Sequence, residues 1–220
     1  MRLQRHEAPK ESKVMKLVNL AGTAIMVNLL FLLACIPVVT IGPAFSGLYS
    51  GVRYMIRGEG AVRGFWEGFK THVVRTIILG VIMVGILFYA VINVNAAYNY
   101  AMELGDFVPL IFYGVLSLPI LMVFAALWPL NIYIEYSFAD WLRNAVNMII
   151  KAPQWVLLSA VITWIPLVMF FWLPDFFWAI AIIFIAAWFA VAAFGSTLFL
   201  KDVMVELKKA KLEEDEEEEE

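Results

Sequence analysis

Long apolar stretches dominate this chain, and short charged connections separate them. Each stretch exceeds the about 20 residues with which a helix crosses about 30 Å of hydrocarbon. The five stretches without Asp, Glu, Lys or Arg are Leu17–Val52, Thr76–Met102, Phe107–Ile134, Ala152–Pro174 and Phe176–Leu200. The pattern therefore predicts an all-α protein, a polytopic bundle of transmembrane helices.

The composition agrees with this class. Hydrophobic residues make up 63% of the 220 positions and charged residues 16%, whereas soluble domains have about 45–50% apolar and about 25% charged residues. We expect a cytoplasmic basic N-terminal arm at 1–16, a transmembrane helical domain at 17–207 and a disordered charged tail at 208–220, whose acidic run repels itself. The expected location is the cell membrane, with the lipid bilayer around the protein.

The first apolar stretch is too long for one straight helix and is interrupted in its middle. Pro37, Gly42 and Pro43 lie there, and proline cannot continue a helix undisturbed. The sequence therefore predicts two elements, of which the second, Ala44–Arg57, is a short and broken span. Irregular backbone at membrane depth needs cover by protein or by a wet cavity, so we expect Pro37–Gly42 inside the bundle.

The sixteen Lys and Arg residues decide the number of crossings. Basic residues are kept in cytoplasmic connections, and the connections Glu103–Asp106 and Pro174–Asp175 contain none. With one crossing before Arg53, the basic groups on either side of the first stretch would lie on opposite sides of the membrane. With two crossings all sixteen lie inside, so we predict six crossings, five long helices and one short broken second span, with both termini cytoplasmic. The alternative is that Ala44–Arg57 enters and leaves on the same side, or lies in the interface.

Small residues follow the break at helical spacing. Gly47 and Gly51 lie four positions apart, a spacing that lets a neighbouring helix approach closely in a membrane. The alternative is a functional half-helix, opened by Gly42 and Pro43, whose N-terminal amides face a cavity as in transporters. The candidate residues of this segment are Pro37, Thr40, Gly42, Pro43, Gly47 and Gly51.

Two of the charged connections contain a helical pattern of their own. From Phe138 to Lys151, apolar residues recur at helical spacing while polar residues occupy the opposite face. This pattern predicts an amphipathic helix, and Phe65–Val73 is a shorter version. Such helices anchor a protein in the headgroup layer, or they form a docking face for a partner. The candidate docking residues are Phe138, Trp141, Leu142, Ala145 and Ile149.

Residues with acid–base, metal-binding or nucleophilic chemistry are scarce. No Asp, Glu, Lys, Arg or His lies within the apolar stretches, whereas ion-coupled transporters carry ionisable residues in the membrane. His6 and His72 have no neighbouring ligand at a metal-binding spacing, and Cys35 is the only cysteine. We expect no enzymatic activity, no cofactor or metal site and no nucleic-acid partner.

The first third of the chain has a recognisable order of short motifs. Its specific part is the Pro-Val-Val-Thr-Ile-Gly run followed by the small-residue helix, within about Leu17–Leu79. The motifs are Asn28–Phe31, Ile36–Pro43, Gly47–Tyr49, Arg53, Phe65-Trp66 and Phe69-Lys70. They resemble the YesL-like family of bacterial multi-span membrane proteins of unknown function. Members of that family often lie near carbohydrate uptake and degradation genes, so the resemblance implies an accessory role in sugar import or its regulation.

Two functions follow as expectations. The first is a non-catalytic accessory or interaction subunit linked to bacterial carbohydrate uptake, which binds a carbohydrate transporter subunit or another membrane protein through its amphipathic segments. The alternative is a small-solute permease or channel with a pathway near the broken segment 37–43. Either function leaves room for a homo-oligomer.

Overall fold

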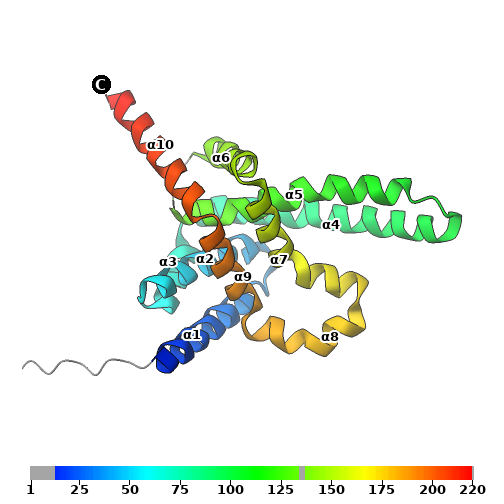
Figure 1. Ribbon diagram of the computed structural model, residues 1–220, viewed down its shortest axis with the longest axis horizontal. Coiled ribbons are helices and arrows are strands. Elements are labelled where there is room, and N and C mark those ends of the chain that lie inside the picture. Colours follow the sequence, from blue (N-terminus) through cyan, green and yellow to red (C-terminus); the bar gives the residue numbers. More distant parts are fainter. Residues whose placement is uncertain (1–12, 134–136, 220) are drawn as a thin grey trace, which may run out of the picture.

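The computed structural model describes residues 13–133 and 137–219 (Figure 1). Residues 1–12, which form most of the predicted N-terminal arm, lie outside the described residues. Within the described part every regular element is helical, which confirms the all-α prediction. The elements are α1 (Lys13–Ala34), the 3₁₀ turn η1 (Val38–Thr40), α2 (Ile41–Arg57), α3 (Ala61–Lys70), α4 (Val73–Leu104), α5 (Val108–Tyr133), α6 (Phe138–Lys151), α7 (Pro153–Trp172), α8 (Pro174–Ile183), the π-helical segment η2 (Phe184–Trp188), α9 (Phe189–Phe199) and α10 (Lys201–Glu219).

Five helical segments of the described chain are long and apolar enough to cross a membrane. They are Val14–Ala34, Val73–Leu104, Val108–Ile132, Pro153–Trp172 and Pro174–Phe199. Many of their large apolar side chains are exposed on the outside of the bundle, as in helices that are apolar all round and lie in lipid. The protein is therefore an integral, multi-pass membrane protein.

The short helix α2 lies at the centre of the bundle (Figure 1). It contacts α1, α3, α4, α5 and α9, and every residue from Gly42 to Val52 is buried. Helices in a membrane associate through close packing and interhelical hydrogen bonds, because lipid is as apolar as their side chains. α2 thus provides the surface against which the longer helices pack.

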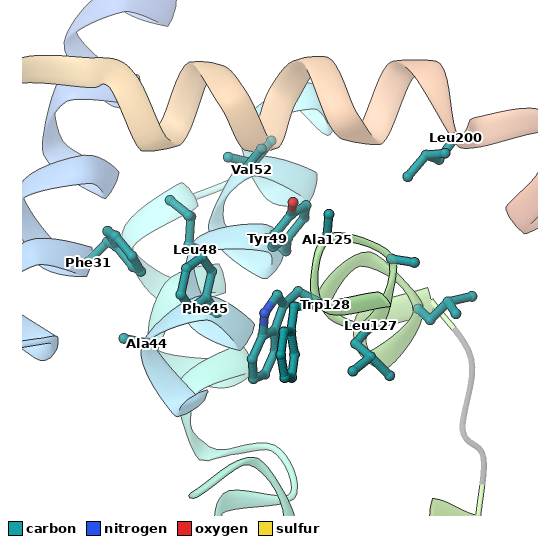
Figure 2. Packing of buried hydrophobic residues seen from close by; sticks show 14 of the residues in the cluster. Phe31, Ala44, Phe45, Leu48, Tyr49, Val52, Ala125, Leu127, Trp128 and Leu200 are labelled. Atoms are coloured by element: carbon teal, nitrogen blue, oxygen red, sulfur yellow. The ribbon is translucent and has the colours of Figure 1, made fainter. Parts of the chain in front are cut away.

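Aromatic side chains fill the space around α2 (Figure 2). The Phe45 ring stacks on Trp128 of α5 at a centroid distance of 5.3 Å, and Phe31 of α1 meets Phe45 edge-on at 5.0 Å. Trp128 in turn contacts Trp141 of α6 at 6.3 Å. Pairs of this kind contribute about 0.5–1.5 kcal/mol each beyond the area that they bury. They connect α1, α2, α5 and α6 into one core.

α3 is an amphipathic helix that returns along α2. Gly58 ends α2 in the left-handed conformation with a φ of 73°, which residues with a Cβ atom rarely adopt. The chain then reverses, and the contacts run from Gly64 beside Tyr54 to Gly68 beside Ser50. This order makes the two helices antiparallel, so α2 covers the apolar side of α3.

Asn28 of α1 supports the π-helical segment between α8 and α9. Its Nδ2 donates to the carbonyl oxygens of Phe184 and Ile185 at 3.1 and 2.8 Å. Its Oδ1 accepts a hydrogen bond from the Ala190 N–H at 3.0 Å. One buried side-chain amide therefore satisfies three backbone groups where the regular α-helical hydrogen bonding is interrupted.

The turn between α1 and α2 does not lie inside the bundle, so this part of the prediction is wrong. Ile36 and Val39 are 74% and 53% exposed. The turn satisfies part of its own backbone, because the Thr40 N–H donates to the Pro37 carbonyl at 2.9 Å and the Thr40 hydroxyl donates to the Ala34 carbonyl at 2.6 Å. Local bonds thus replace some of the cover that the prediction expected from other helices.

The C-terminal segment also differs from the expectation. Disorder was predicted for residues 208–220, whereas α10 continues as a helix to Glu219. The segment consists of Lys, Ala, Leu, Glu and one Asp, and the first four are strong helix formers. Helix propensity therefore opposes the charge repulsion on which the prediction rested.

Candidate functional site

Gly42, at the predicted break, makes the tightest contact of the glycines in α2. A Cβ atom added to Gly42 would lie 1.8 Å from the carbonyl oxygen of Thr76, and one added to Gly80 would lie 2.5 Å from the Gly42 nitrogen. The backbones of α2 and α4 therefore touch, which only glycine permits. Pro43 lies in the first turn of α2, where a missing N–H removes no helical hydrogen bond.

Gly47 and Gly51 lie where α2 meets its neighbours. A Cβ atom at Gly47 would lie 3.0 Å from the Phe65 ring of α3. At Gly51 it would lie 3.1 Å from Val27 of α1 and 3.2 Å from the Ala61 carbonyl of α3. These contacts agree with the close-packing interpretation of the four-residue spacing.

α3 carries a matching pair of glycines that the sequence analysis missed. A Cβ atom would lie 2.4 Å from the Tyr54 side chain at Gly64 and 2.3 Å from the Ser50 Cβ at Gly68. The signal was available, since Gly64 and Gly68 have the same four-residue spacing as Gly47 and Gly51. The segment was interpreted as an interfacial helix, in which small residues have no packing role.

Thr40, beside which a solute site was predicted, bonds to the chain just before it. The Thr40 hydroxyl donates to the carbonyls of Ala34 and Pro37 at 2.6 and 2.7 Å. A cavity of about 270 Å³ lies beside the first turn of α2, and its lining from α2, α4 and α7 is apolar and aromatic, with Phe45 and Met83 among its residues. Such a lining suits hydrocarbon, because a polar solute would lose its hydrogen bonds there.

A buried polar cluster joins α2 to α7 and α9. The Tyr49 hydroxyl lies against the hydroxyl groups of Ser159, Thr163 and Ser196, and Figure 2 shows it directed toward α9. The Ser159 and Ser196 oxygens are 2.6 Å apart. Interhelical hydrogen bonds of this kind hold membrane helices together, which gives the cluster a structural role.

Two further side chains tie α2 to the end of α5. Asn131 Nδ2 donates to Ser46 Oγ at 2.9 Å, and an Arg53 guanidinium N–H donates to the Ile132 carbonyl at 2.7 Å. The last carbonyls of a helix have no partner within the helix, and basic side chains commonly supply one. Arg53 is thereby fixed at the junction of α2 and α5.

Part of the predicted docking face on α6 belongs to the core. Trp141 is 1% exposed, and its indole N–H donates to the Leu127 carbonyl at 2.8 Å. The Arg75 guanidinium lies 4.2 Å from the centre of the Trp141 ring. Ala145 is fully buried, and Ile149 packs against the same core. These three residues contact their own chain, so their assignment to an exposed docking face is corrected.

The surface of α6 retains an apolar line of residues. Leu142, Val146 and Ile150 are 45%, 42% and 72% exposed, and residues four apart lie on one face of a helix. Leu142 is thus open among the predicted docking residues whose side chains are described, while Phe138 is the first residue of the helix and its side chain is not among them. We call Leu142, Val146 and Ile150 the α6 edge.

The exposed side of α3 carries an ion pair. Arg63 Nε donates to Glu67 Oε1 at 2.6 Å, and the Tyr54 hydroxyl donates to the same carboxylate. The bond from Tyr54 and then the bond from Arg63 hold the pKa of the Glu67 carboxyl below its usual value. Water screens such an exposed pair, which therefore adds little to stability.

Groups that bind metals are not assembled in the described part of the chain. Over residues 13–133 and 137–219, no three His, Cys, Asp or Glu side chains gather at one point. His72 lies in the turn before α4 with a φ of 50°, and Cys35 is a half-buried free thiol at the end of α1. Of the candidate residues of the break, Gly42, Pro43, Gly47 and Gly51 are buried packing residues, whereas Pro37 is exposed and Thr40 half-buried in the turn before α2. The described α6 residues are divided between core and surface.

This arrangement defines the chain as a multi-pass membrane protein built around a buried, glycine-rich hairpin of α2 and α3. Residues 24–94 match a family described as a protein of unknown function, DUF624, which is the domain found in YesL-like proteins. The matched region contains the α2–α3 hairpin and parts of α1 and α4, about a third of the chain. No curated protein and no solved structure matches the chain.

Proposed function

We propose that this protein is a non-catalytic interaction subunit of the cell membrane that binds the membrane subunit of a bacterial carbohydrate importer. The closed packing of α2 is the observation that carries the proposal. Gly42 touches the backbone of α4, and the Thr40 hydroxyl is bonded to the end of α1. The segment that would have to pass a solute is therefore filled, whereas the α6 edge faces the surroundings of the protein.

The connection with carbohydrate uptake comes from the family resemblance. Members of the YesL-like family often lie near carbohydrate uptake genes, and residues 24–94 match the domain found in these proteins. A subunit without a polar pathway at its centre suits the assembly or regulation of an importer better than transport of its own.

The proposed orientation places both termini and all sixteen Lys and Arg residues in the cytoplasm. Its first support is the positive-inside rule. Its second support is the arrangement in Figure 1, where the α4–α5 and α7–α8 turns lie toward one end of the molecule and α3 and α10 toward the other. The two turns at the first end carry no basic residue.

Within this orientation, α1 and α2 return the chain to the cytoplasmic side. Gly42 lies beside Thr76 and Gly80 near the start of α4, and α4 continues from Gly80 to Leu104, about 36 Å at 1.5 Å per residue. The α1–α2 turn therefore ends far from the α4–α5 turn. This difference supports a pair of helices that enters and returns, rather than the two full crossings expected from the charges alone.

Site-specific photocrosslinking tests the proposed interaction. A photoreactive amino acid at Ile150, in the exposed α6 edge, is expected to form an adduct with the membrane subunit of a carbohydrate importer in native membranes. Arg63 is exposed on another helix, α3, so the same amino acid at Arg63 is the control and is expected to give no such adduct. Mass spectrometry of the adducts identifies the partner.

Other crosslinking outcomes contradict the proposal in distinct ways. Adducts with lipid alone at Ile150 would leave α6 as a membrane anchor. Adducts with a second copy of this chain would make the α6 edge a homo-oligomer contact. Uptake of a labelled sugar by proteoliposomes that contain only this protein, above that of empty liposomes, would favour the permease instead.

A further inference from the structure

A small basic cavity lies where the end of α2 meets the end of α9 and the start of α10. Its volume is about 220 Å³. Four basic residues line it, Arg53, Arg57, Lys201 and Lys208, and none of the described carboxylates does. Like charges that share so small a volume repel one another, and a bound anion would relieve this repulsion.

One buried hydroxyl adds a polar group that is not otherwise used. Thr197 of α9 lines the same cavity and is 5% exposed, and its Oγ1 has no hydrogen-bond partner. A threonine in a helix commonly donates to a carbonyl one turn earlier, and a buried hydroxyl without a partner is unfavourable. The Thr197 oxygen itself has almost no accessible surface, so it lies behind the cavity wall and the basic side chains supply the polar contacts.

Asp202 and Glu206, two acidic residues of α10, do not line the cavity. Glu206 accepts a bond from Lys151 Nζ at 2.6 Å. Both lie on the side of α10 away from Lys201 and Lys208, because residues four apart share a face and residues two apart do not. Glu59 lines a separate cavity that shares Ile56 and Arg57 with this one.

The basic residues of the cavity come from two helices, α2 and α10. Arg53 is held by its bond to the Ile132 carbonyl, and Arg57 lies in the last turn of the buried helix α2. Lys201 and Lys208 lie seven positions apart, two turns along one face of α10. The remainder of the wall is apolar and comes from Ile56, Leu198, Met204 and Val205.

We propose that this cavity binds a phosphoryl anion, which the headgroup of an anionic phospholipid or a soluble phosphate supplies. Guanidinium and ammonium groups bind phosphate oxygens through charge-assisted hydrogen bonds. The apolar wall accommodates the glycerol and upper acyl carbons of a lipid. Basic pockets between membrane helices bind lipid headgroups in this way.

Native mass spectrometry of the full-length protein, stripped of lipid in detergent, tests the proposal. Phosphatidylglycerol is expected to bind more tightly than phosphatidylcholine. The double variant Arg57→Gln, Lys201→Gln is expected to bind phosphatidylglycerol at least about tenfold more weakly, because two charge-assisted contacts are lost. The control Lys70→Gln, Lys209→Gln removes the same charge outside the cavity and is expected to bind like the unaltered protein.

Two further measurements identify the source of the phosphate and protect the test against misfolding. Millimolar inorganic phosphate that displaces phosphatidylglycerol indicates a soluble ligand, and lipid binding that resists it indicates a headgroup. Lys201→Arg keeps the charge and is expected to retain binding, and Thr197→Val, which changes a group behind the cavity wall, is expected to retain it as well. The proposal is overturned by equal binding of the two lipids, by equal weakening in both double variants, or by loss of binding in Lys201→Arg.

Discussion

Gly42 and Gly80 let the backbones of α2 and α4 touch, and each is needed because the other is there. The space at Gly42 is bounded by backbone atoms of Thr76, which cannot rotate away as a side chain can. Gly85, on the same helix α4, has nothing within 4 Å of an added Cβ atom. Alanine substitutions at Gly42 and Gly85 can therefore be compared to separate the effect of a steric clash from the intrinsic preference of a helix for alanine.

We predict that Gly42→Ala strongly destabilises the protein. Overpacking of a filled core costs about 1–3 kcal/mol and more where backbone must move, so the thermal transition in detergent is expected to fall by several degrees. Gly85→Ala should leave it unchanged or raise it slightly, since alanine is favoured over glycine in a helix by about 0.5–1 kcal/mol. Tryptophan fluorescence during heating measures both, and equal transitions in the two variants would remove Gly42 from its proposed role.

At the scale of elements, the sequence predicted the long helices because their signal is local. Apolar length and the lack of charges suffice to place five segments that can span the membrane. Which side of an amphipathic helix meets protein and which meets lipid depends on distant elements, so Trp141 and Ile150 look alike in the sequence although one is buried and the other exposed. For the same reason, the pattern of α3 indicates an amphipathic helix, and only the contacts with α2 reveal which side of it is covered by protein.

The α1–α2 turn is the element whose position differs most from the prediction, which placed it inside the bundle. Its side chains Ile36, Val38 and Val39 are apolar and exposed, and bonds within the turn satisfy part of its backbone. Apolar side chains favour hydrocarbon, whereas the external headgroup layer would place them next to water.

We therefore predict that Val39→Cys, in a Cys35→Ser background, does not react with a membrane-impermeant maleimide added outside intact cells. Asp106→Cys in the same background lies in the α4–α5 turn and should react, which controls for access of the reagent. Gly60→Cys, in the turn between α2 and α3, should react only after permeabilisation. Rapid external labelling at position 39 would instead support two full crossings by α1 and α2 and restore the six-crossing topology.

At the scale of the whole molecule, the buried hairpin and the basic cavity lie at different ends of the same helix. Gly42, at the start of α2, packs on α4, whereas Arg57, at its end, lines the cavity with α10. In the proposed orientation the end of α2 is cytoplasmic, and there the cavity is within reach of the anionic inner leaflet. Orientation, anion binding and the cytoplasmic location of α10 thus depend on one another.

The orientation yields a prediction for the complete chain. With Cys35→Ser as background, Asp175→Cys in the α7–α8 connection is expected to react with the impermeant maleimide in intact cells, since that connection has no basic residue. Arg63→Cys and Lys209→Cys should react only after permeabilisation. External reaction of Lys209→Cys alone would place an odd number of crossings between the two ends of the bundle and would separate the cavity from the cytoplasm. External reaction of Arg63→Cys would place the tip of the α2–α3 hairpin outside, and the positive-inside argument would fail for the region that α2 organises.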